Sequence, residues 1–313
     1  MSTQEARHET DREVYGIVFT ESAGFKDTYG GSDGTVFLES QRIVPRGVPS
    51  DTVLLFMHPI GGGAFLPFVS EMARSGAHVI YCNSRYRGND SALIMEKVVL
   101  DMGQAIADAK RRFGYERVVL AGWSGGGALS LLYQQQARRP SITHTPAGDE
   151  LDLTAAALEP AQAMMLVAAH PSRHRVLTDS LDASIPDEAD PAARDPRLNI
   201  YDNAGPQPPY GEEFVASYRD AQLARNRRIT AWVKGELARL RAAGRPHDET
   251  GFVVHGTMAD PRWLDPAIDP NERRAGVCYL GDPRVVNDGP VGLARFCSPV
   301  SYTHLTLPTI LRV

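Results

Sequence analysis

Short apolar runs alternate with longer segments of helical spacing over the first 170 residues. Two runs near the N-terminus, 14–19 and 35–38, flank the Gly-rich turn 30–34 and predict antiparallel strands. Four later runs are continuously apolar, as is typical of strands buried on both faces: 53–57, 79–82, 118–121 and 164–169. Between these runs, helical spacing is found over 65–75, over 92–113 and up to about 137. This alternation predicts βαβ units in a mostly parallel sheet with helices on both faces.

The alternation ends near residue 171, and a different pattern follows. Residues 172–211 are rich in Asp, Pro and Arg, and 212–243 have the spacing of one long helix. Pro-rich segments come next. We therefore expect a disordered lead-in over 1–13, an α/β core over 14–171 and a mainly helical insertion over 172–299 that lies over the sheet ends.

The third continuous run leads into Gly122-Trp123-Ser124-Gly125-Gly126, which matches the G-x-S-x-G pattern between a strand and a helix. A sharp turn there exposes the Ser124 hydroxyl, and glycines allow strand and helix to approach closely. A phosphate-binding loop is the alternative, but no lysine stands where that loop needs one, because Leu129 follows Gly127 and Ala128. The pattern predicts that Ser124 is a nucleophile.

A second Gly-rich turn, His58-Pro59-Ile60-Gly61-Gly62-Gly63, follows the first continuous run. In an acyl-transfer enzyme such a loop donates one backbone N–H to the oxyanion, and the residue after the nucleophile, here Gly125, donates the other. We favour Ile60 or Gly61 as the loop donor, and the spacing alone does not choose between them. A turn without catalytic role is the alternative.

Residues from about 15 to 170 resemble the core of the α/β-hydrolase superfamily. The resemblance rests on these two Gly-rich turns and on the segment Arg87-Gly88-Asn89-Asp90-Ser91, which stands in the place of that family's R-G-x-G/D-S loop. The resemblance implies a serine hydrolase that cleaves an ester, amide or related acyl bond. It also implies that a catalytic acid and then a histidine follow the serine, and that 172–299 form a cap around the acyl pocket. Pro59 departs from the commoner His-Gly start of the oxyanion loop.

The acid and the histidine of the implied triad are not evident in the sequence. His255, in a short strand-like run, is a candidate base with Asp179 or Asp182 as its acid, but a cap or loop histidine is the alternative. Asp260 with His304 has the right order in the chain. We therefore leave both triad partners unassigned and expect them to be absent.

The final segment, 300–313, contains His304 and has an unusual resemblance of its own. Residues 300–309 agree with an in-frame translation of a transposase adapter used in sequencing libraries. A genuine terminal strand is the alternative. We expect a non-native tail on a chain cut near Pro299, which would leave the enzyme inactive; a stop codon directly after the Val313 codon in genomic DNA would contradict this.

Composition narrows the remaining function classes. The formal net charge of −5 disfavours nucleic acid and anionic lipid as partners, and no apolar run reaches the roughly 20 residues that span a bilayer. The three cysteines, Cys82, Cys278 and Cys297, are too far apart for a metal motif and fit a reducing compartment. We therefore expect a cytoplasmic enzyme without metal or cofactor, acting on a small acyl substrate.

Two alternatives to a hydrolase stay open. An acyltransferase of the same fold would pass the acyl group to an alcohol instead of water. A binding protein of α/β-hydrolase type would use no nucleophile at all, although it has little need of a serine in a strained turn.

Overall fold

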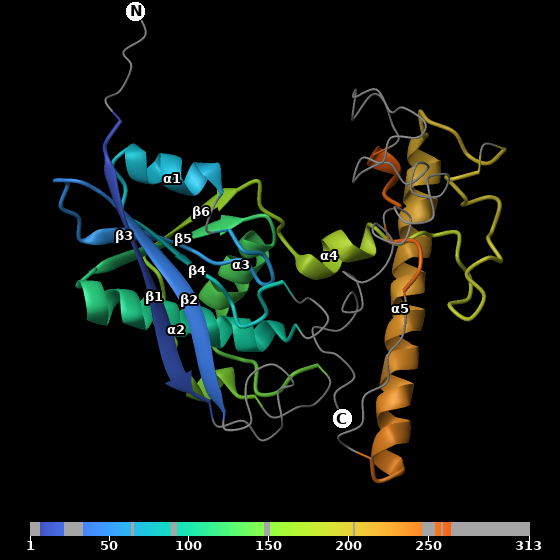
Figure 1. Cartoon of the computed structure of the whole chain (residues 1–313). Coiled ribbons are helices and arrows are strands. Elements are labelled where there is room, and N and C mark those ends of the chain that lie inside the picture. The colour runs from blue at the N-terminus through green and yellow to red at the C-terminus, as the bar shows by residue number, and fades with distance from the viewer. Residues whose placement is uncertain are drawn as a thin grey trace, which may run out of the picture. The chain divides into compact units, whose positions relative to one another are not determined.

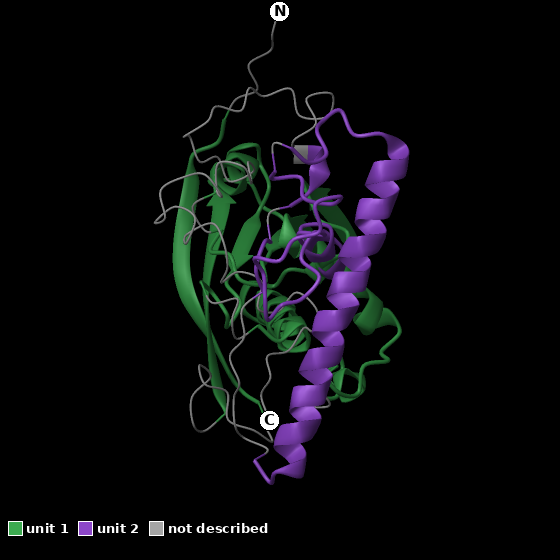
Figure 2. Ribbon diagram, turned by 90° about the vertical axis from the view of Figure 1, so that its right-hand side faces the viewer, with its two compact units in different colours: residues 1–173 green, residues 174–313 purple. Residues whose placement is uncertain are grey.

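A computed structural model describes residues 7–21, 34–63, 66–88, 93–146, 151–202, 204–245, 254–257 and 259–263. The chain divides into two compact units, Met1–Arg173 and His174–Val313 (Figure 2). The division falls two residues from the boundary expected at 171. The role of the second unit as a cap stays a prediction.

The first unit is built on a six-stranded sheet in the order β1-β2-β4-β3-β5-β6 (Figure 1). Its strands are β1 Thr10–Thr20, β2 Thr35–Pro45, β3 Thr52–Phe56, β4 Val79–Cys82, β5 Arg117–Trp123 and β6 Ala163–Val167. β1 and β2 are antiparallel, and β2 pairs antiparallel with β4. β4, β3, β5 and β6 are all parallel to one another. This is a mixed, mostly parallel sheet, and each of the six strands predicted over the first 170 residues is present.

The N-terminal hairpin is longer than its apolar runs indicate. β1 begins at Thr10, within the predicted lead-in, because its polar first residues pair with the end of β2, Thr10 opposite Pro45. Arg46 fixes this end of the ladder by donating to Asp11 and Glu9 at 2.7 Å each. Backbone pairing, which hydrophobicity does not report, thus places Thr10–Glu13 in a strand instead of the predicted lead-in.

Three helices cover the sheet: α1 Pro67–Arg74, α2 Met95–Phe113 and α3 Gly125–Arg138. α1 lies on one face, where Val69 and Ala73 pack with Phe56 and Val79, and α2 and α3 lie on the other (Figure 1). α2 ends at Gly114, whose φ of 73° is the left-handed conformation that closes a helix. A 3₁₀ turn, Leu153–Ala155, precedes β6.

The second unit contains one long helix, α5 Glu212–Ala242, with the short helix α4 Arg173–Thr178 at the division and a 3₁₀ turn at Pro261–Trp263. Most other described residues between α4 and α5 form turns and irregular segments. A small apolar cluster of Ala183, Ile200, Tyr218 and Ala259 packs this unit. Its helical content is therefore concentrated in α5, as the sequence predicts for 212–243.

In the part of the chain that the structure describes, no helix is long and apolar enough to cross a membrane. Over the same residues, no group of histidine, cysteine and acidic side chains is arranged to hold a metal ion. Cys82 is buried within β4, and the other two cysteines lie outside the described residues.

Candidate active site

Ser124 stands at the junction of β5 and α3, between Trp123 and Gly125. Its backbone has φ 51° and ψ −123°, a conformation that L-residues other than glycine rarely adopt. Such strain costs about 1–3 kcal/mol and persists only where the surrounding structure imposes it. α3 begins at the next residue, so its free N–H groups and the positive end of its dipole lie at the serine.

Glycines around Ser124 are required by close approach of the backbone. A Cβ on Gly122 would lie 2.6 Å from the Cα of Gly127, and one on Gly126 would lie 2.5 Å from the carbonyl oxygen of Met57. Both distances are shorter than real Cβ contacts allow. The sequence pattern is therefore a steric requirement of this turn, as the nucleophile motif predicts.

Backbone hydrogen bonds fix the turn from β6. The Ser124 N–H donates to Val167 at 3.3 Å, and the Ser124 carbonyl accepts from His170 at 2.9 Å and from Gly127 at 3.1 Å. The peptide groups on both sides of the serine are thus held. Among the described residues, none forms a hydrogen bond with the Ser124 hydroxyl oxygen.

The predicted oxyanion loop lies next to this turn, and three of its carbonyls are tethered. Ser84 Oγ donates to the Pro59 carbonyl, the Gly88 N–H donates to Ile60 at 2.8 Å, and Tyr81 donates to Gly61 at 2.8 Å. In a trans peptide the C=O and the following N–H point in opposite directions. The N–H groups that follow these carbonyls therefore all face away from the tethers.

The His58 side chain accepts hydrogen bonds from two of these N–H groups. Ile60 and Gly61 donate to its Nδ1 at 3.2 and 2.7 Å. The two predicted loop donors thus point into the imidazole ring rather than into open space. Their role as direct oxyanion donors stays a prediction, and it requires the His58 ring to move away.

The His58 ring lies against the nucleophile turn. A Cβ on Gly125 would be 2.8 Å from Nε2, and the ring centroid is 5.8 Å from that of Trp123. Burial lowers the pKa of His58 to about 4, and the positive charges of Arg173 and His170 act in the same direction. The imidazole is therefore neutral at neutral pH. The order of the chain gave no reason to assign it a role, because the implied triad histidine follows the serine.

The loop after β4 is anchored by a buried ion pair. The Arg85 guanidinium donates to Asp101 Oδ1 at 2.7 and 2.9 Å, and the Arg85 N–H donates to Oδ2 at 3.0 Å. Both side chains are at most 5% exposed. Of the motif predicted over 87–91, Arg87 and Gly88 are described and the other three residues lie outside the described residues.

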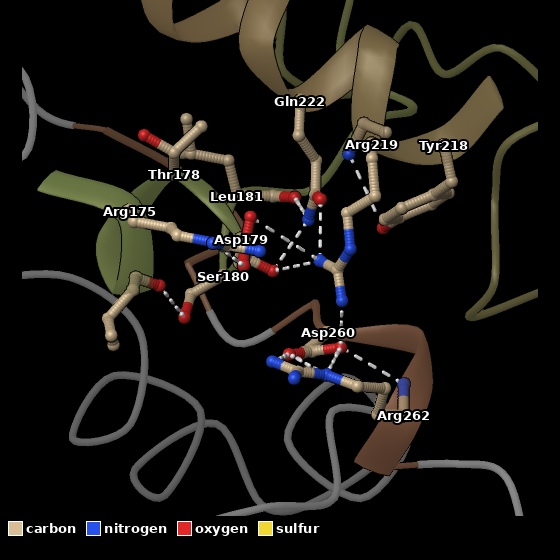
Figure 3. A network of polar contacts seen from close by, with 12 residues as sticks. Arg175, Thr178, Asp179, Ser180, Leu181, Tyr218, Arg219, Gln222, Asp260 and Arg262 are labelled. Carbon is tan, nitrogen blue, oxygen red and sulfur yellow. Dashed lines mark hydrogen bonds and ion pairs between the residues drawn. The ribbon is translucent and has the colours of Figure 1, made fainter. Parts of the chain in front are cut away.

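The remaining triad candidates belong to the second unit. Asp260 is held by Arg219 at 2.6 Å and by Arg262 at 2.5 Å, and these arginines lower its pKa against the effect of burial (Figure 3). Figure 3 also shows Asp179, whose backbone carbonyl accepts from Arg219 and Gln222. Both residues thus take part in a network that packs this unit.

Asp182 and His255 have structural contacts of the same kind. Asp182 is fully buried, accepts from Ser184 Oγ at 2.6 Å and pairs with Arg194. The His255 side chain is exposed, and its carbonyl accepts from Arg225 at 2.7 Å. The described residues 254–257 form no strand. His304 lies outside the described residues.

No protein-family model matches the sequence, and no curated protein matches it. Among solved structures, the chain is similar to brefeldin A esterase, a bacterial homologue of human hormone-sensitive lipase, at 17% identity over 44% of this chain and 38% of that one, with a TM-score of 0.29. It is similar to a bacterial heroin esterase at 18% identity over 56% and 47%, with a TM-score of 0.31. A third is a lipase described as putative from Sulfolobus solfataricus, at 16% identity over 46% and 47%, with a TM-score of 0.33. Each match spans less than half the length of the solved chain.

Proposed function

We propose that this protein is a serine hydrolase that cleaves an acyl ester or amide through an acyl-enzyme on Ser124. The observation that carries the proposal is the positive φ of Ser124 between β5 and α3. Local strain of this kind collects at functional sites. Ala157 and Ala168 also have a positive φ, and Ser124 differs from them because it directly precedes α3 in a turn that requires glycine at positions 122 and 126.

The turn supplies two parts of acyl-transfer chemistry. The Ser124 hydroxyl oxygen attacks the substrate carbonyl carbon and loses its proton to water or hydroxide, and the carbonyl electron pair moves onto oxygen. The Gly125 N–H, at the first residue of α3, is in position to stabilise that oxyanion together with donors of the oxyanion loop. Collapse of the intermediate expels the alcohol or amine, and water then releases the acid.

A general base for Ser124 is not assigned, and this sets the expected rate. Loss of the histidine from a serine protease triad lowers kcat by about 10⁶, yet the oxyanion site and binding alone retain about 10³–10⁴ over water. We therefore propose that the chain of 313 residues acylates at Ser124 but turns over slowly.

The test is covalent labelling with a fluorophosphonate at pH 9, where the higher hydroxide concentration assists removal of the serine proton during attack. Intact-mass and peptide analysis should place one phosphonyl group on Ser124, and Ser124→Ala should abolish it. Ser130→Ala is the matched control, because this serine lies in α3, the helix that follows Ser124, and donates to the Gly126 carbonyl at 2.8 Å. Absence of labelling on a folded chain would favour a binding protein without a nucleophile.

A further inference from the structure

The His58 imidazole has a defined proton position. Its Nδ1 accepts two N–H groups, from Ile60 and Gly61, so this nitrogen carries no proton. A neutral imidazole has one N–H, which must then be on Nε2. The loop therefore selects one tautomer of the ring, and the free donor of the ring is Nε2–H.

That donor faces the nucleophile turn. Nε2 lies 2.8 Å from the position a Cβ would take on Gly125, so only glycine lets the ring come this close. Gly125 is also the residue whose N–H follows the nucleophile. The imidazole donor is therefore in close contact with the residue that directly follows Ser124.

The His58 ring is held on its Nδ1 side by the oxyanion loop. The carbonyls of Pro59, Ile60 and Gly61 are tethered by Ser84, Gly88 and Tyr81, so the N–H groups that point at Nδ1 are fixed. These N–H dipoles draw electron density toward Nδ1 and make Nε2–H a better donor. A donor fixed before reaction needs no reorganisation when charge develops on the substrate.

We propose that His58 is a further catalytic residue, whose Nε2–H donates a hydrogen bond to the oxyanion formed on Ser124. This inference rests on the proposed function. The loop N–H groups of Ile60 and Gly61 then act through the imidazole rather than on the substrate directly. The Nε2 proton stays on nitrogen throughout: as the Ser124 oxygen–carbon bond forms, the carbonyl π pair moves to oxygen and accepts the hydrogen bond, and it returns when the leaving group departs.

Burial supports the neutral form that this role requires. The pKa of His58 is lowered to about 4, with Arg173 and His170 as the charged or titratable groups that add to the effect of burial. The ring is therefore a neutral donor across the pH range in which esterases are assayed.

The first experiment measures the rate constant of Ser124 phosphonylation by a fluorophosphonate at pH 9 in the full chain. Loss of one oxyanion donor costs about 10²–10³ in rate, so His58→Leu should slow phosphonylation about 100-fold. His58→Gln keeps one acceptor and one donor and should stay within about tenfold of the wild type. Equal rates for the wild type and His58→Leu would overturn the role of His58, while absence of Ser124 labelling in the wild type would overturn the proposed function and this inference together.

The second experiment does not depend on variants. In protein with ¹⁵N-labelled histidine, His58 should show a protonated Nε2 and a bare Nδ1 by NMR. Its Nε2–H proton resonance should move downfield after phosphonylation of Ser124, because the phosphonyl oxygen occupies the oxyanion position. A purely structural His58 would leave that resonance unmoved, and the opposite tautomer would overturn the proposal.

Discussion

The Ser124 backbone at φ 51° is kept in place by its neighbours: Val167, His170 and Gly127 bond its peptide groups, and Gly122 admits the following turn. At this scale the sequence pattern predicted a tight turn at Ser124 and the glycines that it requires, because those glycines are fixed by steric contacts, and the role of Ser124 as a nucleophile stays a proposal. The pattern was not sufficient for His58. The acceptor role of its ring depends on carbonyl tethers from Ser84 and Tyr81, which lie 25 and 20 residues from the carbonyls that they hold and carry no local signal.

The strain at Ser124 predicts an unusual order of variant stabilities. Ser124→Gly should be more stable than Ser124→Ala by about 1 kcal/mol. Glycine adopts a positive φ without strain and alanine does not, and the larger entropy of glycine in the unfolded chain offsets part of this gain. Urea unfolding of both variants measures the difference. Equal midpoints would show that the turn relaxes when the hydroxyl is removed.

The lowered pKa of His58 predicts a loss of stability in mild acid. Its folded value is about 4 and its unfolded value about 6.5, so between these pH values the unfolded chain binds more protons. Stability therefore rises with pH across this window and is lost as pH falls from 6.5 to 4, by on the order of 1–3 kcal/mol. His58→Gln should lack this part of the pH dependence when unfolding is compared at pH 7 and pH 5. Parallel curves for the two proteins would contradict the shift.

At the scale of elements, the continuous apolar runs identify β3, β4, β5 and β6 because strands covered on both faces leave no alternation. The apolar runs do not predict the order of these strands in the sheet. β4 lies between β2 and β3, and nothing in the local pattern of either strand states this neighbour. Order is set by which faces the helices cover and by right-handed crossovers, and both are long-range properties.

The close approach of β5 and α3 predicts a strong effect of one methyl group. Gly122→Ala should destabilise the protein by about 1–3 kcal/mol, because the new Cβ would meet backbone atoms of Gly126 and Gly127 at 2.6–2.9 Å. Gly235→Ala, in the middle of α5 with open space around it, should instead stabilise by about 0.5–1 kcal/mol. In denaturant unfolding, the two variants should change the free energy of unfolding in opposite directions. An unchanged free energy of unfolding for Gly122→Ala would show that the turn accommodates a Cβ at this position.

The ion pair between the β4 loop and α2 predicts a contrast with a surface pair. Asp101→Asn should cost about 3 kcal/mol, because it leaves the Arg85 charge buried with less compensation. Asp11→Asn removes an exposed partner of Arg46 and should cost no more than about 1 kcal/mol. Thermal or urea unfolding of the two variants checks both values. Similar losses would mean that Glu21, the other partner of Arg85, carries most of the compensation.

At the scale of the whole molecule, the chain has two compact units and a small negative charge. The sequence pattern changes near residue 171 and the two units divide after Arg173, while the assignment of the second part as a cap stays a prediction. The sequence predicted fewer of the interactions that pack the second unit. Arg225 is fully buried there, pairs with Glu188 and donates to the carbonyls of Asp182 and His255, and an arginine on a helix is usually read as a solvent-facing residue.

The charge balance predicts where the protein is least soluble. The net charge is −5 at pH 7, and it becomes less negative as the pH falls. Solubility should therefore pass through a minimum near the sequence isoelectric point of about 6.0. Light scattering between pH 5 and pH 8 measures this, and a minimum well above pH 7 would contradict the balance of charges.

The three tethers of the oxyanion loop have a consequence for how such a protein diversifies. The loop carbonyls are held by Ser84, Gly88 and Tyr81 on the side opposite the loop N–H groups. The residues that fix the geometry of the loop are therefore separate from the side of the loop on which its N–H groups lie. Mutations on that side leave the geometry intact. A lineage, or a designed library, can therefore vary the residues around this loop while the positions of its peptide groups are inherited unchanged.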